Sequence, residues 1–138
     1  DAGAERAMIG RMEIWLNPAC SKCKAATVAL DGSGEIYTVR RYLEAPPTHE
    51  ELEAVLARLG MEPWDLVRMS DPAAKALETL ERAPATRAQW VDAMVKTPSL
   101  IQRPIITASD GTTVVGRNAE ALEQVIAAEK AAGDATSG

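Results

Sequence analysis

The fold of this chain is decided by residues 12–23, MEIWLNPACSKC. The apolar run at residues 12–16 predicts a β-strand. The pair Asn17-Pro18 predicts a turn directly after it, because both residue types favour turns. Residues 21–30 then predict a helix, so the cysteines of this stretch lie where a strand passes into a helix.

Cys20 and Cys23 are the only cysteines among the 138 residues, and they form a Cys-x-x-Cys pair at this junction. A helix N-terminus has unpaired N–H groups and a partial positive charge, and both favour a thiolate over a thiol. The side chains of Lys22 and Lys24 add two full charges. Such surroundings lower the pKa of a cysteine from about 8.5 into a range of roughly 3.5–7.5. We therefore predict that Cys20 is a nucleophile, with Cys23 one helical turn behind it.

The elements that follow complete a β-α-β unit. Gly32 is the expected end of the helix, and residues 36–39 are the expected second strand, reached by a right-handed crossover. A Cys-x-x-Cys pair at the start of a β-α-β unit is typical of thioredoxin-like proteins.

The middle of the chain has the spacing of helices. A helix is expected to begin near His49 and to end at Gly60, and residues 61–98 are expected to be all-helical. N-cap signals predict helix starts at Thr48 with Glu51, Asp71 with Pro72, and Thr86 with Gln89.

The C-terminal part predicts a β-hairpin and a last helix. Residues 105–108 and 112–115 are the expected strands, joined by a turn at Asp110-Gly111. Asn118 is the expected cap of the helix that follows.

This order of elements, β-α-β, helices and β-β-α, predicts an α/β fold with a mixed four-stranded sheet and helices on both faces. Residues 12–130 are expected to form one thioredoxin-like domain with a helical insertion at about 61–98. Residues 1–11 and 131–138 are expected to be flexible tails.

Composition argues against several classes of protein. The net charge of −5 disfavours a nucleic-acid-binding face, because such faces are basic. No apolar run reaches the length of a membrane span, and residues 1–11 lack the apolar centre of a secretory signal. With only two cysteines, these features indicate a cytoplasmic protein. The native N-terminus is expected at Met8, at Met12 or further upstream.

Two other interpretations of the cysteine pair are less favoured. A structural zinc site needs four ligands, and the chain offers one histidine, His49, and no further cysteine, so no metal is expected. Free cysteines are often inert and buried. The flanking lysines and the helix start favour a reactive pair instead.

Three arginines are candidates for binding an anion. Arg103 precedes Pro104 just before the expected hairpin, and the bond between them is a candidate for the cis form. In a thioredoxin-like fold that loop faces the cysteine, so Arg103 is expected to project toward Cys20. Arg117 follows the last strand, and Arg68 lies among apolar residues. Several guanidinium groups around a thiolate make a site for a tetrahedral oxyanion, held by bidentate hydrogen bonds.

Five motifs in chain order, spread over residues 12–126, resemble the glutaredoxin-dependent arsenate reductases. The motifs are Asn17-Pro18-Ala19-Cys20, residues 42–48 (YLEAPPT), residues 66–68 (LVR), residues 101–105 (IQRPI) and Gly116-Arg117. The resemblance implies a thioredoxin-like fold with a helical insertion and a nucleophile at Cys20. It also implies that arsenate is bound by Arg68, Arg103 and Arg117. The structural residues expected near the site are Asn17, Pro18 and Pro104.

The chain departs from that family pattern at two positions. Leu16 stands where members typically have a histidine, so the thiolate depends on the arginines, the lysines and the helix end. Cys23 stands where the best-known members have serine, and it resembles the Cys-x-x-Cys switch of Spx, a thiol-stress transcription regulator of the same superfamily. The reductant is therefore left open between an internal disulfide and a mixed disulfide with a small thiol.

Three functions are compatible with these patterns. The first is an arsenate reductase without a bound cofactor, in which Cys20 attacks arsenic, Cys23 or glutathione (or an equivalent small thiol) completes the reduction, and a glutaredoxin or thioredoxin restores the enzyme. The second is an Spx-like regulator that docks on the RNA polymerase alpha subunit, which Arg117 fits less well. The third is a general dithiol oxidoreductase, with the arginines as relics or as a site for glutathione carboxylates. The resemblance favours the first.

Overall fold

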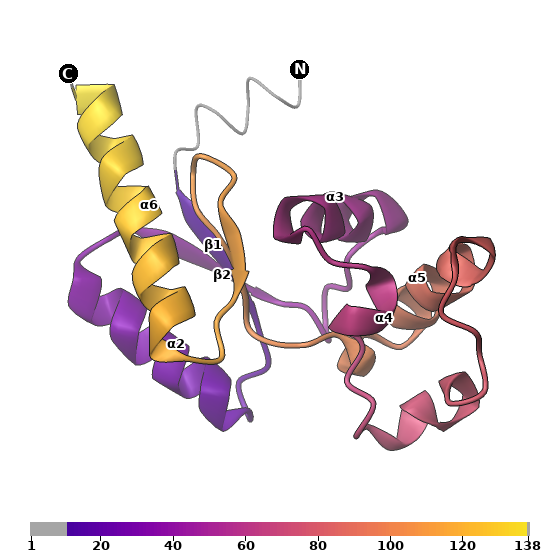
Figure 1. Ribbon diagram of the computed structural model, residues 1–138. Coiled ribbons are helices and arrows are strands. Elements are labelled where there is room, and N and C mark those ends of the chain that lie inside the picture. Colours follow the sequence, from indigo (N-terminus) through magenta and orange to yellow (C-terminus); the bar gives the residue numbers. More distant parts are fainter. Residues whose placement is uncertain (1–10, 138) are drawn as a thin grey trace. The chain divides into compact units, whose positions relative to one another are not determined.

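The computed structural model describes residues 11–137 and divides into two compact units (Figure 1). The sheet unit consists of residues 11–41 and 103–137, and the helical unit is Tyr42–Gln102. The helical unit thus begins earlier in the chain than the insertion expected at about 61–98.

The sheet unit is built on four strands in the order β2-β1-β3-β4. The strands are β1 (Met12–Leu16), β2 (Tyr37–Arg41), β3 (Ile105–Thr107) and β4 (Thr113–Val115). β1 and β2 are parallel, whereas β1 with β3 and β3 with β4 are antiparallel. The expected mixed four-stranded sheet is therefore confirmed. Ile14 in the centre of β1 lies opposite Val39 on one side and Ile106 on the other, so both halves of the unit meet on β1.

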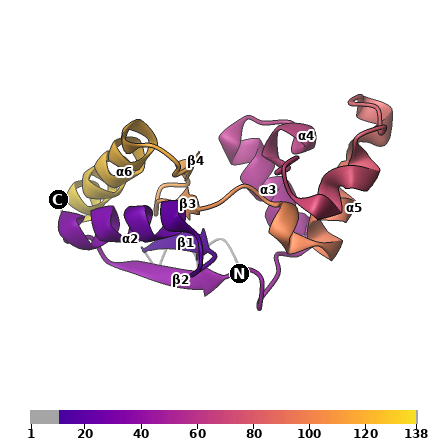
Figure 2. The same cartoon turned by 90° about the horizontal axis from the view of Figure 1, so that it is seen from below.

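Helices α2 (Ser21–Ser33) and α6 (Ala119–Ser137) lie side by side against the sheet (Figure 2). Both helices contribute to one buried cluster, in which alternate residues of β1 face inward. Its buried members are Met12, Ile14, Leu16, Cys23, Ala26, Leu30, Ile106, Ala108, Val114 and Val125. Within this unit both helices therefore cover the same face, where the sequence predicts helices on both faces.

Helix α2 ends later than predicted. Gly32 lies inside the helix, and Gly34 adopts the left-handed backbone (φ 77°) that ends it. The N–H of Gly34 donates to the carbonyl of Asp31 at 3.3 Å. Two glycines within three residues offered two possible ends, and only the one with positive φ is the C-cap.

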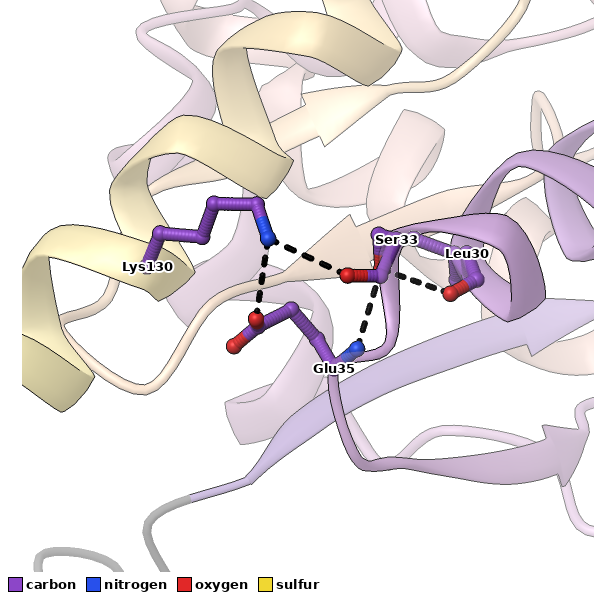
Figure 3. Close-up of polar contacts among 4 residues, drawn as sticks. All are labelled: Leu30, Ser33, Glu35 and Lys130. Carbon is purple, nitrogen blue, oxygen red and sulfur yellow. Dashed lines mark hydrogen bonds and ion pairs between the residues drawn. The ribbon is translucent and has the colours of Figure 1, made fainter.

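A polar cluster joins the end of α2 to α6 (Figure 3). The ammonium group of Lys130 donates to the carbonyl of Ser33 at 3.1 Å and lies 3.3 Å from Oε2 of Glu35. The hydroxyl of Ser33 donates to the carbonyl of Leu30 at 2.6 Å and accepts the N–H of Glu35 at 3.1 Å. These contacts satisfy carbonyl groups that the helix end leaves without partners.

The C-terminal hairpin and its helix form as predicted. Gly111 has a φ of 94° in the turn between β3 and β4. Oδ1 of Asn118 accepts the N–H of Ala121 at 2.8 Å at the start of α6. The buried carboxylate of Glu129 accepts the N–H of Ser109 at 2.7 Å and its hydroxyl at 2.6 Å, which ties α6 to the hairpin.

The two chain ends were expected to be flexible tails. At the C-terminus the backbone of α6 continues to Ser137, so residues 131–137 are helical. Arg11 of the expected N-terminal tail is exposed and has no regular secondary structure, and residues 1–10 and residue 138 lie outside the described part of the chain.

The helical unit combines α-helices with 3₁₀-helices. The α-helices are α3 (His49–Leu59), α4 (Pro63–Leu66) and α5 (Arg87–Lys96). The 3₁₀-helices are η1 (Pro72–Leu77), η2 (Pro84–Thr86) and η3 (Pro98–Leu100). Over the stretch that the structure covers, no helix combines the length and the apolar character required to cross a bilayer.

The predicted N-caps of this unit have different outcomes. Thr48 and Glu51 form the expected capping box, and Gly60 ends α3 with a φ of 67°. Asp71 caps the N–H of Ala73 at 2.8 Å, but the helix that follows is the 3₁₀-helix η1.

The capping box expected at Thr86 and Gln89 is absent. The hydroxyl of Thr86 instead donates backward to the carbonyls of Glu81 (2.6 Å) and Ala83 (3.0 Å). The reason is local, because η2 runs directly into α5, and Thr86 lacks the extended backbone that a capping side chain needs.

Candidate active site

The loop that presents Cys20 is built by Asn17. Its carbonyl accepts the N–H of Cys20 at 3.0 Å, and its side-chain Oδ1 accepts the N–H of Ala19 at 3.0 Å. Pro18 lies exposed between them. The loop delivers Cys20 to the N-cap of α2, where its own carbonyl accepts the N–H of Lys24 at 3.1 Å. Asn17 and Pro18 are therefore part of the loop that leads into Cys20.

The surroundings of Cys20 favour its thiolate. Burial of the sulfur by itself raises its pKa, but a hydrogen bond from the guanidinium of Arg103 opposes this effect. The backbone N–H groups of Cys23 and Lys22, and the thiol of Cys23, act in the same direction as Arg103. The net result lowers the pKa of Cys20 to about 7, so close to half of the sulfur is ionised at neutral pH. Cys20 remains partly accessible to solvent.

Cys23 lies behind Cys20 and behaves oppositely. Its side chain is buried in the core between α2 and the sheet. Burial raises its pKa most, the N–H of Asn17 at 3.4 Å opposes this, and the negative charge of Cys20 adds to the rise. The pKa of Cys23 is raised to about 11, so at neutral pH it is a thiol that donates to the Cys20 thiolate.

Hydrogen bonds join Arg103 and Pro104, which precede β3, to Gly116 and Arg117, which follow β4. The bond between Arg103 and Pro104 is cis. The carbonyl of Pro104 accepts the N–H of Gly116 at 2.8 Å. Nη1 of Arg117 donates to the carbonyl of Arg103 at 3.0 Å. The sheet unit therefore brings Cys20, Arg103 and Arg117 into one region, because β3 pairs with β1.

Arg68, the third predicted arginine, belongs to the helical unit. Its Nη1 donates to Oδ2 of Asp71 at 3.1 Å and to the carbonyl of Ser99 at 2.9 Å. Its guanidinium is partly buried.

Among the described residues, no group of three or more histidine, cysteine, aspartate or glutamate side chains could hold a metal ion.

Comparison with known proteins identifies the family. The model of the ArsC family matches residues 15–125. The chain belongs to the ArsC family. Its four-stranded sheet and the position of its cysteines are the thioredoxin-like ArsC fold.

Named relatives of this ArsC chain include arsenate reductases. The arsenate reductase of Escherichia coli K12 is 31% identical over 124 residues, which cover 90% of this chain and 87% of that enzyme. The solved structure of an arsenate reductase from Vibrio cholerae has a TM-score of 0.70 at 30% identity and covers 85% of this chain and 96% of that one. An uncharacterized protein in the glnII region of Streptomyces viridochromogenes is 54% identical over 117 residues, or 83% of this chain and 98% of that protein.

The structure shows where Leu16 and the two lysines lie relative to the Cys20 thiolate. Leu16, at the position where a histidine was expected by resemblance, is buried in the core. Lys22 and Lys24 are exposed, and it is the backbone N–H of Lys22, not its ammonium group, that favours the thiolate. The N–H groups of the first helical turn thus favour the thiolate as predicted, whereas the ammonium groups of the two lysines are not among the groups that lower the pKa of Cys20.

The contacts made by Gly116 and by the backbone of Asn17 were not predicted from the sequence. The N–H of Asn17 donates to the Cys23 sulfur, and the N–H of Gly116 holds Pro104. Main-chain contacts leave little pattern in a sequence. The Gly116-Arg117 pair was the one available signal, and it was used only for its arginine.

Proposed function

We propose that this protein is a thiol-dependent arsenate reductase that uses Cys20 as its nucleophile. One observation supports this most strongly, namely that the Cys20 thiol has a pKa of about 7 and a hydrogen bond from Arg103. A sulfur that is nucleophilic at neutral pH and faces a guanidinium suits attack on an anionic electrophile. The arsenate reductase names of several ArsC relatives point to arsenate as that electrophile.

Arginines bind the substrate in this proposal. Arg103 and Arg117, from the two sides of the hairpin, hold arsenate oxygens through charge-assisted hydrogen bonds. Arg68 is the third proposed ligand, because it lies in one of the motifs that resemble the arsenate reductases. Phosphate has nearly the same shape and charge, so binding alone discriminates poorly. The discrimination comes from the chemistry, because arsenic accepts the thiolate and then two electrons.

In the first step the Cys20 thiolate attacks arsenic. A sulfur–arsenic bond forms, one arsenic–oxygen bond breaks, and the departing oxygen takes up protons from solvent and leaves as water. The arginines stabilise the negative charge on the remaining oxygens.

In the second step a second thiol attacks the Cys20 sulfur. A disulfide forms, the sulfur–arsenic bond breaks, and its electron pair stays on arsenic, which is reduced from As(V) to As(III) and leaves as arsenite. Cys23 is the proposed thiol, and its proton passes to an arsenic-bound oxygen. The repulsion by the Cys20 thiolate, which helps to raise the pKa of Cys23, ends when that sulfur bonds to arsenic.

The disulfide is then reduced by an external thiol system. Glutathione or an equivalent small thiol with glutaredoxin, or thioredoxin, supplies the two electrons. The proposed compartment is the cytoplasm, where such thiols are kept reduced.

The proposal is tested by measuring arsenite production by the wild-type protein, Cys20→Ser and Cys23→Ser. Each protein is assayed once with glutathione plus glutaredoxin and once with thioredoxin as the reductant. Wild type is expected to turn over and Cys20→Ser to be inactive. Turnover by Cys20→Ser would rule out Cys20 as the nucleophile. Cys23→Ser is expected to lose thioredoxin-supported turnover and to keep activity only when glutathione replaces the missing thiol.

A second candidate function is favoured by the Cys23 thiol donating to Cys20, an arrangement that also suits a general dithiol oxidoreductase. In that case the wild-type protein reduces protein or glutathione disulfides, and arsenate gives no turnover with either system. The same Cys-x-x-Cys pair fits an Spx-like regulator. A pull-down of the RNA polymerase alpha subunit by oxidised but not reduced protein would favour that role.

A further inference from the structure

We infer that Gly116 is a positioning residue of this site. Because it has no side chain, it can lie close to Ile106, where its N–H holds the carbonyl of Pro104 and so keeps Arg103 in place against Cys20. The reaction it serves is the proposed one. Its effect, however, is measured on the Cys20 thiol and needs no arsenate.

Gly116 is a glycine for reasons of space and not of backbone conformation. Its φ is not among the positive values, which in the described chain occur at Gly34, Gly60 and Gly111. Gly116 is buried, and a Cβ added there would lie 2.7 Å from Cδ1 of Ile106. Carbon atoms that are not bonded to one another pack at about 3.5–4.0 Å, so an alanine forces something to move.

The neighbours of that missing Cβ surround the Arg103-Pro104 segment. The Cβ would also lie 3.1 Å from Cδ2 of Leu122 on α6 and 3.4 Å from Cγ of Pro104. Ile106 follows Pro104 by two residues on β3. A side chain at Gly116 therefore presses on the side chains of Ile106 and Leu122, whereas its distance to Pro104 is an ordinary van der Waals contact. Ile106 is buried, so residue 116 itself is expected to shift away from it.

A shift of residue 116 reaches Arg103 through hydrogen bonds. The N–H of Gly116 donates to the carbonyl of Pro104 at 2.8 Å. Nη1 of Arg117 donates to the carbonyl of Arg103 at 3.0 Å. These two bonds keep the strand end and the arginine backbone in register. Arg103 is in turn the side chain whose hydrogen bond lowers the pKa of Cys20.

The decisive measurement is the rate of iodoacetamide alkylation of the full chain against pH, in wild type and Gly116→Ala. The wild-type midpoint is expected at about 7. In Gly116→Ala the midpoint is expected to rise, and the rate at pH 7 is expected to fall about fivefold, as a rise of one pKa unit produces at a midpoint. Gly32→Ala is the matched control, because it lies in α2 with nothing within 4 Å of the added Cβ, and it should keep the wild-type profile.

Two further variants separate positioning from general loss of stability. Arg103→Gln should raise the midpoint, and adding Gly116→Ala to it should raise it no further, because both act through one contact. Ile106→Val removes the Cδ1 atom that lies nearest to the added Cβ. The alkylation midpoint of the double variant Gly116→Ala with Ile106→Val should therefore move back toward the wild-type value.

A folded Gly116→Ala with the wild-type alkylation profile overturns the inference, even if its melting temperature falls. Should Gly116→Ala not fold, Gly116→Ala with Leu122→Val takes its place, since it relieves the contact with α6 and leaves those with Ile106 and Pro104. A raised midpoint in that variant supports the positioning role, and an unchanged one overturns it. If arsenate is not reduced by wild type while these profiles shift as expected, the proposed function fails and the role of Gly116 stands.

Discussion

The sheet unit and the helical unit differ in how their important contacts span the sequence. In the sheet unit Cys20 and Arg103 come from opposite ends of the chain and meet because β3 pairs with β1. In the helical unit several of the polar contacts are local, such as Thr48 with Glu51 and Arg68 with Asp71. The reactive sulfur therefore depends on long-range pairing. The helical unit has long-range polar contacts as well, such as Arg87 with Glu53, but its helix caps are local features that a sequence shows directly.

Arg103→Lys is expected to have the largest effect, and it separates the two units when compared with Arg68→Lys. Lysine lacks the planar fork of arginine, so arsenate turnover by Arg103→Lys should fall about 100-fold. Its thiolate midpoint should also rise, because the hydrogen bond to Cys20 is altered. Steady-state kinetics and pH-dependent alkylation are the two measurements.

Arg68→Lys should weaken arsenate binding and leave the alkylation midpoint at the wild-type value. Arg68 is in the other unit and is not among the groups that lower the pKa of Cys20. Equal shifts of the midpoint in both variants would show that thiolate stabilisation is not confined to the sheet unit.

The pH dependence of the two thiols sharpens the contrast within the sheet unit. With a pKa of about 7 for Cys20, alkylation should quicken roughly 100-fold from two pH units below that midpoint to full ionisation. Cys23, with a pKa of about 11, should stay unmodified at neutral pH, and peptide mass mapping would locate the label. A lowered folded-state pKa means that ionisation of Cys20 stabilises the fold above the ordinary thiol pKa and that this contribution is lost as pH falls through about 7. Equal labelling of both cysteines at pH 7 would contradict this assignment.

Glu129→Ala should destabilise the sheet unit through a long-range contact. Removing the carboxylate leaves the N–H and hydroxyl of Ser109 without their acceptor, at a cost of about 1–3 kcal/mol in the free energy of unfolding. Urea denaturation measures the change. Glu123→Ala, an exposed position on the same helix, is the control and should be close to neutral. A similar loss in both variants would mean that the Ser109 contact is not responsible.

Thr48→Ala should have the smallest effect, and it tests a local contact of the helical unit. Loss of this N-cap costs about 1 kcal/mol in the free energy of unfolding, whereas Thr48→Ser keeps the hydroxyl and should restore most of it. The alkylation midpoint of Cys20 should not change in either variant. A change would connect the cap of α3 to the thiol and break the distinction between the units.

The elements that were predicted correctly have strong local signals. The strand at Met12–Leu16, the capping box at Thr48 and the turn at Gly111 each follow from neighbouring residue types. The box predicted at Thr86 failed because a 3₁₀-helix precedes α5 and turns the hydroxyl backward. The end of α2 was placed at Gly32, since a sequence does not show which of two nearby glycines takes a positive φ.

The candidate site was predictable in its residue types and less so in its physics. The Cys-x-x-Cys pair, the cis bond at Pro104 and the approach of Arg103 to Cys20 were anticipated. Backbone N–H groups at the helix start were expected to favour the thiolate and they do, whereas the lysine side chains, also expected to favour it, are not among the groups that lower the pKa of Cys20. A role for Arg68 at the site remains a prediction.

By itself the sequence determined the order of elements, the reactive pair at a helix start and membership of the ArsC family, because these depend on neighbouring residues and on motifs in series. The sequence also favoured Cys20 as the ionised sulfur, but only the tertiary structure supplied the physical cause of the wide difference in pKa between the two sulfurs. That outcome depends on burial of Cys23 against the sheet and on an arginine more than eighty positions away, held in place by the backbone of Gly116. Burial and distance act through space, and no local pattern of residues encodes them.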